Sequence, residues 1–222
     1  AQEEYLKWKY SLLGDLCSKE VRRVKQTGYA AGQLCCKVES RCSPVLNPFY
    51  DLFDKPKRVT RKALNLLDPL GLAIWYMDDG TLNIEYYPRA DGGFGIRRRR
   101  LAFATDCFSL KEHYIIQRYF KVVWDIDTKI QKVVYKKRNS ECYRLLMNYE
   151  NAKKFVAIVE PHIHPTMKYK IDFNRERNYR NAEHSNKNDD IVCSPVKAGE
   201  VPEMSDPLPS GSLNNSSVVS NR

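Results

Sequence analysis

Residues Leu70 to Gly80 read LGLAIWYMDDG, an apolar run that is broken by two adjacent acids and then a glycine. The preceding Asp68-Pro69 pair predicts the start of a helix, because Asp is a good N-cap and Pro is favoured in the first turn. Asp78 and Asp79 would then lie in the last turn, at the negative end of the helix macrodipole, with the glycine as a natural stop. Two acids there repel each other and the dipole, so a divalent metal ion is the leading candidate to offset them. The same string is also common in turns, and that reading stays open.

The charge of the chain is unevenly distributed. The 222 residues carry a net charge of +10. From His184 onward three basic residues face five acidic ones, which leaves +12 on residues 1–183. Such a balance favours a polyanionic partner, most often nucleic acid, although a generally basic soluble protein would show the same charge.

Cysteine usage and hydropathy narrow the class of protein. The seven cysteines are odd in number and form no Cys-x-x-Cys pair, which argues against a disulfide scaffold and a zinc ribbon and favours an intracellular protein. No apolar run approaches the ~20 residues that span a membrane, so we expect no membrane partner. The chain opens inside a helical pattern without Met or a signal peptide, and we expect it to be cut from something longer.

Periodicity along the chain predicts an α+β fold with an internal pseudo-repeat. After residue 68 the order is helix, hairpin, helix, hairpin, helix, and residues 1–68 resemble the later part of the same order. Beyond about residue 181 the chain is rich in Ser, Asn, Pro and Asp and is predicted to be disordered. The predicted helices are 3–16, 45–53, 69–79, 109–120 and 151–159, with a short element at 165–173, and the predicted strands are 21–26, 34–39, 82–87, 95–104, 128–135 and 141–147.

The densest charge run lies in the hairpin that follows the key helix. Arg97 to Arg100 occupy its second strand, and alternation places at least two of these arginines on one face. A two-stranded ribbon fits the DNA major groove, and Arg is the leading reader of guanine. A basic strand can also simply protect a sheet edge. We predict DNA contact by seven residues of the two hairpins: Arg97, Arg98, Arg99, Arg100, Tyr86, Lys132 and Lys136.

The segment from Leu72 to Gly80, LAIWYMDDG, resembles the nine-residue motif of the LAGLIDADG homing endonucleases. The W-Y-M-D-D-G variant is similar to the subgroup of single-chain enzymes with two motifs. Three further strings fit that subgroup, namely YLKWK at 5–9, TDCFS at 105–109, and the stretch from Pro161 to Lys170. The chain departs from the pattern in showing only one motif.

The resemblance implies a specific site and architecture. In this family two motif helices pack together, and one acid from each binds divalent metal, usually Mg²⁺, between the scissile phosphates. The eighth motif position falls on Asp79, which is therefore the expected metal ligand and catalytic residue, with Asp78 beside it. The family's lysine near the end of each repeat matches Lys170, with Lys168 as the alternative. A third catalytic position, often glutamine, corresponds to Asp106, and that departure leaves its role open.

The resemblance also implies the division of the chain and its partners. Residues 1–68 correspond to the C-terminal part of a first repeat, residues 69–180 to the second repeat and residues 181–222 to a polar tail. The partners are double-stranded DNA and a second LAGLIDADG helix, from a preceding segment or another chain. The host compartment is an organelle or a prokaryotic or phage-infected cytoplasm.

The leading functional hypothesis is a site-specific endonuclease of a mobile intron or intein that cuts both DNA strands. Two alternatives are a maturase-like protein that binds intron RNA and a remnant that binds DNA without cutting it. Asp79 and Lys170 favour an active enzyme over the remnant.

Overall fold

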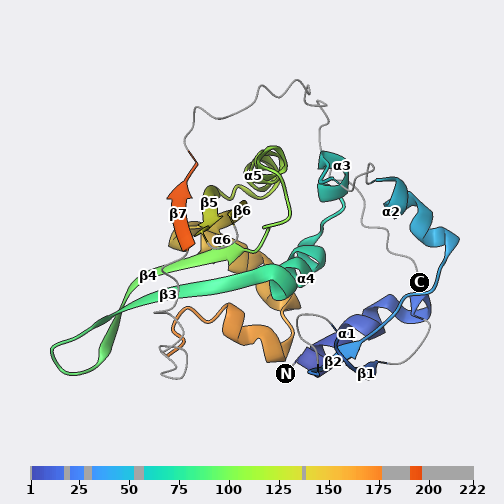
Figure 1. The fold of residues 1–222 in the computed structure, drawn as a ribbon, viewed down its shortest axis with the longest axis horizontal. Helices are drawn as coiled ribbons and strands as arrows, with labels where there is room; N and C mark the ends of the chain where they lie inside the picture. Colours follow the sequence, from blue (N-terminus) through green and yellow to red (C-terminus); the bar gives the residue numbers. More distant parts are fainter. Residues whose placement is uncertain are drawn as a thin grey trace, which may run out of the picture.

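The computed structural model describes residues 2–17, 21–27, 32–52, 58–136, 139–176 and 191–196. Helices α4 (Pro69–Asp79), α5 (Leu110–Trp124) and α6 (Tyr149–Val159) cover one face of a five-stranded sheet (Figure 1). A separate two-stranded hairpin lies in the N-terminal part of the chain. The predicted α+β class is confirmed. No helix in the described part of the chain has the length and apolar character needed to cross a membrane.

The large sheet is antiparallel throughout. Its strand order is β3 (Gly80–Pro88), β4 (Phe94–Phe103), β6 (Ser140–Met147), β5 (Lys129–Tyr135) and β7 (Ile191–Pro195). The β3–β4 hairpin is long and extends beyond the other strands (Figure 1). Its turn contains Gly92 at a φ of 80°, a conformation that favours glycine.

Strand β7 overturns part of the prediction for the tail. Disorder was expected from residue 181 onward, but Ile191–Pro195 pairs with β5 along its outer edge. An edge strand offers unpaired N–H and C=O groups, and the β-branched residues Ile191 and Val192 suit an added strand. Apart from 191–196, the residues from 181 to 222 lie outside the described residues.

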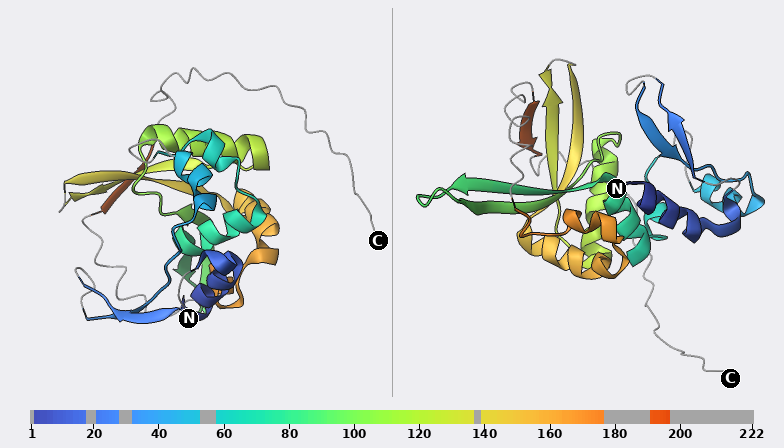
Figure 2. Two further views of the ribbon diagram at one scale, coloured as in Figure 1. Left: turned by 90° about the vertical axis from the view of Figure 1, so that its right-hand side faces the viewer. Right: turned by 90° about the horizontal axis from the view of Figure 1, so that it is seen from below.

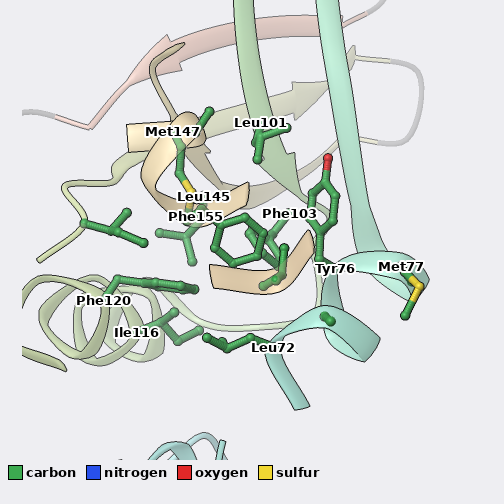
Figure 3. Packing of buried hydrophobic residues seen from close by; sticks show 14 of the residues in the cluster. Leu72, Tyr76, Met77, Leu101, Phe103, Ile116, Phe120, Leu145, Met147 and Phe155 are labelled. Carbon is green, nitrogen blue, oxygen red and sulfur yellow. The ribbon is translucent and has the colours of Figure 1, made fainter. Parts of the chain in front are cut away.

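Helix α4 begins where local signals predict. The Asp68 side chain accepts a hydrogen bond from Gly71 N at 2.7 Å, and Pro69 occupies the first turn. Inside the core the Tyr76 ring meets Phe103 and Phe155 edge-on, at centroid distances of 5.5 and 5.3 Å (Figure 3). These contacts fix the rotation of α4 about its own axis.

Helix α4 ends at Gly80, the glycine expected to stop it, and the next strand begins at once. Gly80 has extended backbone angles (φ −83°, ψ 151°) and is also the first residue of β3. A Cβ atom at this position would overlap both the ring and the carbonyl oxygen of Tyr76. Glycine is therefore required because the new strand passes closely over the last turn of the helix.

Helix α5 begins with the predicted capping box. Ser109 Oγ accepts from Glu112 N, and the Glu112 carboxylate accepts from Ser109 N at 2.7 Å. The same carboxylate also accepts from Val59 N at 2.7 Å, which ties the segment before α4 to α5.

The N-terminal part contains α1 (Gln2–Leu13), β1 (Arg22–Lys25), β2 (Leu34–Lys37), α2 (Asn47–Asp51) and α3 (Arg61–Leu64), with the short 3-10 helices η1 (Gly14–Leu16) and η3 (Pro44–Leu46). Helix α1 packs against the 3-10 helix η6 (Pro165–Lys170), and α5 packs against α3. The 3-10 helix η5 (Glu160–His162) follows α6 directly. The right-hand view of Figure 2 shows the β1–β2 and β5–β6 hairpins projecting from the same side of the molecule.

Candidate active site and nucleic-acid interface

The end of α4 presents two adjacent carboxylates, of which one is bound by a lysine and the other is not. Asp78 is bound by Lys9 of α1, whose Nζ lies 2.9 and 3.1 Å from its two carboxylate oxygens. No donor in the described part of the chain binds the carboxylate of Asp79, which remains exposed at the helix end. Asp79 is therefore the acid that is available to an external ligand.

Lys170 lies at the same helix end, as the sequence predicts. Its ammonium group donates to the carbonyl oxygens of Met77 at 2.6 Å and Gly80 at 2.8 Å. The Tyr76 hydroxyl donates to the carbonyl oxygen of Lys170 at 2.7 Å and anchors the backbone of that lysine. The alternative candidate, Lys168, is exposed. Lys170 thus places a positive charge at the negative end of the helix macrodipole.

Burial is the main cause of the pKa shifts at the end of α4. Burial raises the pKa of Asp79, and the carboxylate of Asp78 adds to the effect, while Lys170 and Lys9 oppose it. Burial also lowers the pKa of the Lys170 ammonium, against the attraction of both acids. A divalent cation at this position would stabilise the ionised form of Asp79, which burial and Asp78 disfavour.

The donor set at this site fits a magnesium ion that is shared with a substrate. The described residues contain no group of three or more His, Cys, Asp or Glu side chains placed to hold a metal. Mg²⁺ commonly binds through one or two carboxylates, and phosphate oxygens and water complete its octahedral shell. The free oxygens of Asp79 suit this mode, in which most ligands of the ion come from outside the side chain that anchors it.

The structure does not bring Asp106 into this group. Its carboxylate accepts two hydrogen bonds from Arg144, at 2.7 and 2.8 Å, and a longer one from the Tyr135 hydroxyl at 3.3 Å. The hydrogen bonds from Arg144 hold the pKa of Asp106 below its usual range. An acid that is already neutralised by a guanidinium is a poor metal ligand, so the catalytic role predicted for Asp106 is not supported by its contacts.

The pairing register defines which face of the sheet is free. Leu101 pairs with Met147 and Phe103 with Leu145, and all four side chains are buried beneath the helices. Residues one position away point to the opposite side. We call that side the open face; it carries Thr81, Asn83, Glu85, Arg98, Arg100, Gln131 and Arg144.

A β-bulge changes how the arginine run is distributed between the two faces. Glu85 pairs with Arg98 and Tyr86 pairs with Ile96, which leaves Arg97 as an extra residue. Arg97 and Arg98 both approach the carboxylate of Glu85, at 3.8 and 3.7 Å. The open face therefore holds Arg97, Arg98 and Arg100, one arginine more than simple alternation predicts.

Of the four remaining residues predicted to contact DNA, three bind other groups of the protein and only Lys136 is exposed. Arg99 donates to the carbonyl oxygen of Phe173 at 2.9 Å, and the Tyr86 hydroxyl donates to that of Arg175 at 2.5 Å. Lys132 shares the helix-covered face with Ile130 and forms an ion pair with Glu141 at 2.6 Å. Tyr86, Arg99 and Lys132 are thus occupied within the protein, on the side away from the open face. Lys136 is exposed at the end of β5.

Two residues of this region were missed by the sequence analysis. Arg144 lies on the open face, and the two-residue alternation of β6 around the buried Leu145 could have found it. Lys9 neutralises Asp78 from 69 residues away in sequence, and no local pattern points to that contact.

Comparison with known proteins adds a family assignment. A family model described as "LAGLIDADG DNA endonuclease family" matches residues 1–155. An intron-encoded endonuclease named ai4, from Dictyostelium discoideum, is 28% identical over 125 residues, which cover 55% of this chain and 67% of that protein.

Longer relatives and a solved structure also match. A protein named RecA from Mycolicibacterium fallax is 25% identical over 173 residues, which cover 77% of this chain and 38% of that protein. The chain therefore spans less than two fifths of the length of this relative. The structure of the homing endonuclease I-WcaI bound to its DNA recognition sequence aligns with a TM-score of 0.62 and 17% identity, over 78% of this chain and 73% of that one. At this identity the structural match demonstrates a shared fold.

Proposed function

The chain belongs to the LAGLIDADG DNA endonuclease family, and on this premise we propose that it is a metal-dependent, site-specific endonuclease that hydrolyses both strands of double-stranded DNA. The observation that carries the proposal is the free carboxylate of Asp79 at the end of α4, next to the ammonium group of Lys170. In metal-assisted hydrolysis of a phosphodiester, an anionic side chain holds the metal ion, and a positioned cation beside it stabilises the negative charge that develops on the phosphate.

Each group at the end of α4 has a distinct role in the proposed reaction. Asp79 would hold a divalent ion, which supplies Lewis acidity and lowers the pKa of bound water. Lys170, fixed by two carbonyl oxygens, would stabilise negative charge that develops on the phosphate. Asp78, neutralised by Lys9, would contribute to the local charge balance and would not bind the metal.

The open face would contact the DNA duplex. Arg97, Arg98 and Arg100 give it positive charge, and the long β3–β4 hairpin extends the surface along a groove. The exposed Lys136 lies at the end of the neighbouring hairpin and suits a phosphate contact. Binding through the open face would place the catalytic group at the end of α4 over a defined position of the duplex.

The proposal includes a second motif helix with its own acid. We assign residues 1–68 to the end of a first repeat and residues 69–180 to the second. The two parts make matching contacts, which supports this division. Helix α1 of the first part packs on η6 near the end of the second, and α5 of the second part packs on α3 near the end of the first. Several apolar side chains of the first part are exposed and suit a further partner: Leu12, Leu13, Leu34, Phe49, Tyr50 and Leu66. The partner acid would come from the same protein or another chain, and the similarity to an intron-encoded endonuclease supports a mobile-element origin.

The proposal is tested by cleavage of a supercoiled plasmid library that carries random inserts. With Mg²⁺ we expect linear products whose ends share one flanking sequence, and with EDTA we expect none. A linear product that forms equally with EDTA would contradict metal dependence. Tight binding to a structured intron RNA without any DNA cutting would contradict the endonuclease assignment.

A further inference from the structure

Arg144 is held in place before any ligand binds. Its Nε donates to Asp106 Oδ1 at 2.7 Å, and its Nη2 donates to Asp106 Oδ2 at 2.8 Å and to the Tyr135 hydroxyl oxygen at 2.7 Å. These three bonds use the Nε hydrogen and both Nη2 hydrogens. The guanidinium is therefore fixed in orientation by residues from the β4–α5 loop and from β5.

One end of the same guanidinium remains available. The Nη1 nitrogen, with two N–H groups, has no acceptor in the described part of the chain, and the Arg144 side chain retains 33% of its exposure. Arg144 lies on the open face, and its cross-strand neighbour is Gln131. Arg and Gln are the side chains that most often read guanine and adenine in the major groove.

The ligand of the Arg144 Nη1 group could be a phosphate or a base edge, and the net charge of the Arg144–Asp106 pair favours the base edge. Arg144 and Asp106 together carry no net charge, and the Asp106 carboxylate would repel a nearby phosphate. A base edge is uncharged, so its acceptors meet the directional Nη1 donors without that repulsion. Guanine offers two such acceptors, O6 and N7, side by side. A guanidinium that is already ordered also loses less conformational entropy on binding.

We propose that Arg144 reads a base edge, most favourably guanine, in the DNA target, and that Asp106 and Tyr135 are the positioning residues that orient it. This inference rests on the proposed endonuclease function. It also explains why an acid stands at Asp106, where the family often has glutamine: the carboxylate accepts two parallel bonds from a guanidinium, which an amide cannot do.

The test is selection of bound sequences from a randomised duplex library, in EDTA so that no strand is cut. The proteins compared are the wild type, Arg144→Gln, Asp106→Ala and Tyr135→Phe. Arg118→Gln is the matched control, because Arg118 is an exposed arginine on α5, on the helix-covered side. Thermal unfolding of each variant establishes that it is folded, and Tyr135→Phe removes only one hydroxyl.

We expect the wild type and Arg118→Gln to enrich the same sequence. Arg144→Gln should lose its preference at one or two adjacent base pairs, where discrimination falls by about tenfold or more. Asp106→Ala should relax the same positions, Tyr135→Phe should do so more weakly, and the double variant of Asp106 and Arg144 should be no worse than Arg144→Gln alone.

Three results would overturn the inference. An unchanged preferred sequence in Arg144→Gln would show that this side chain reads nothing. Uniform weakening across all sequences, with the salt dependence reduced by about one phosphate contact, would assign Arg144 to the DNA backbone. A wild type that enriches no sequence would overturn the proposed function as well, whereas the first two results leave that function standing.

Discussion

Replacing Lys170 with Met removes the cation that binds the end of α4 and keeps most of the aliphatic side chain. The ammonium group donates to Met77 O and Gly80 O at 2.6 and 2.8 Å and is half-buried. A hydrogen bond to a charged group contributes about 1.5–3 kcal/mol, and burial of the ammonium offsets part of the gain from the pair. We therefore expect the free energy of unfolding to fall by about 2–3 kcal/mol, allowing for that offset.

The measurement is urea unfolding followed by far-UV circular dichroism, with a thermal scan beside it. A loss of that size lowers Tm by about 4–12 °C in a protein of this length. Lys168→Met is the matched control, since it makes the same change in charge at an exposed position two residues away, and it should stay within about 0.5 kcal/mol of the wild type. Equal losses of stability in the two variants would refute the claim that the Lys170 hydrogen bonds stabilise the end of α4.

Two further predictions follow from the same structure. Gly80→Ala should lower the free energy of urea unfolding by about 1–3 kcal/mol, because the new methyl group overlaps Tyr76, and a change below about 0.5 kcal/mol would mean that the helix end moves freely. Asp106→Asn should reduce the loss of stability in acid. Because Arg144 lowers the folded-state pKa of Asp106, this group stabilises the protein above the unfolded value of about 3.9, and that stability is lost as pH falls through the folded pKa. Urea unfolding between pH 5 and pH 3 measures it, and identical pH dependence in the two proteins would count against the ion pair.

Local signals in the sequence were sufficient to place the main elements. Asp68 and Pro69 predicted the start of α4, and Ser109 with Glu112 predicted the start of α5; both are confirmed. The two hairpins after α4 were also predicted within a few residues of their observed bounds. These features depend on neighbours in sequence, whose capping and alternation rules act over three or four residues.

The contacts that define the site depend on residues far apart in sequence. Lys9 meets Asp78 across 69 residues, and Arg144 meets Asp106 across 38. Nothing in the local pattern distinguishes an acid that is neutralised by a distant cation from one that is free. The family resemblance led to Asp79 and Lys170, which the structure brings together at the end of α4. It left the role of Asp106 open, and the side-chain partners of Asp106 lie on the open face.

The bulge illustrates a second limit of sequence reasoning. Alternation assigns two arginines of the run to each face, but the extra residue Arg97 shifts the balance to three and one. A bulge depends on the pairing of two strands, Glu85 with Arg98 and then Tyr86 with Ile96, and one strand alone does not encode it.

The metal site is tested most directly by plasmid cleavage in Mg²⁺. The proteins compared are the wild type and two single variants at adjacent residues, Asp79→Asn and Asp78→Asn. The free carboxylate of Asp79 is assigned to the metal, and Asp78 is neutralised by Lys9. We expect Asp79→Asn to lower the cleavage rate by about a hundredfold or more while sequence-specific DNA binding persists, and Asp78→Asn to retain most of the activity. Full cleavage by Asp79→Asn, or loss of cleavage in Asp78→Asn alone, would contradict the assignment of the metal site.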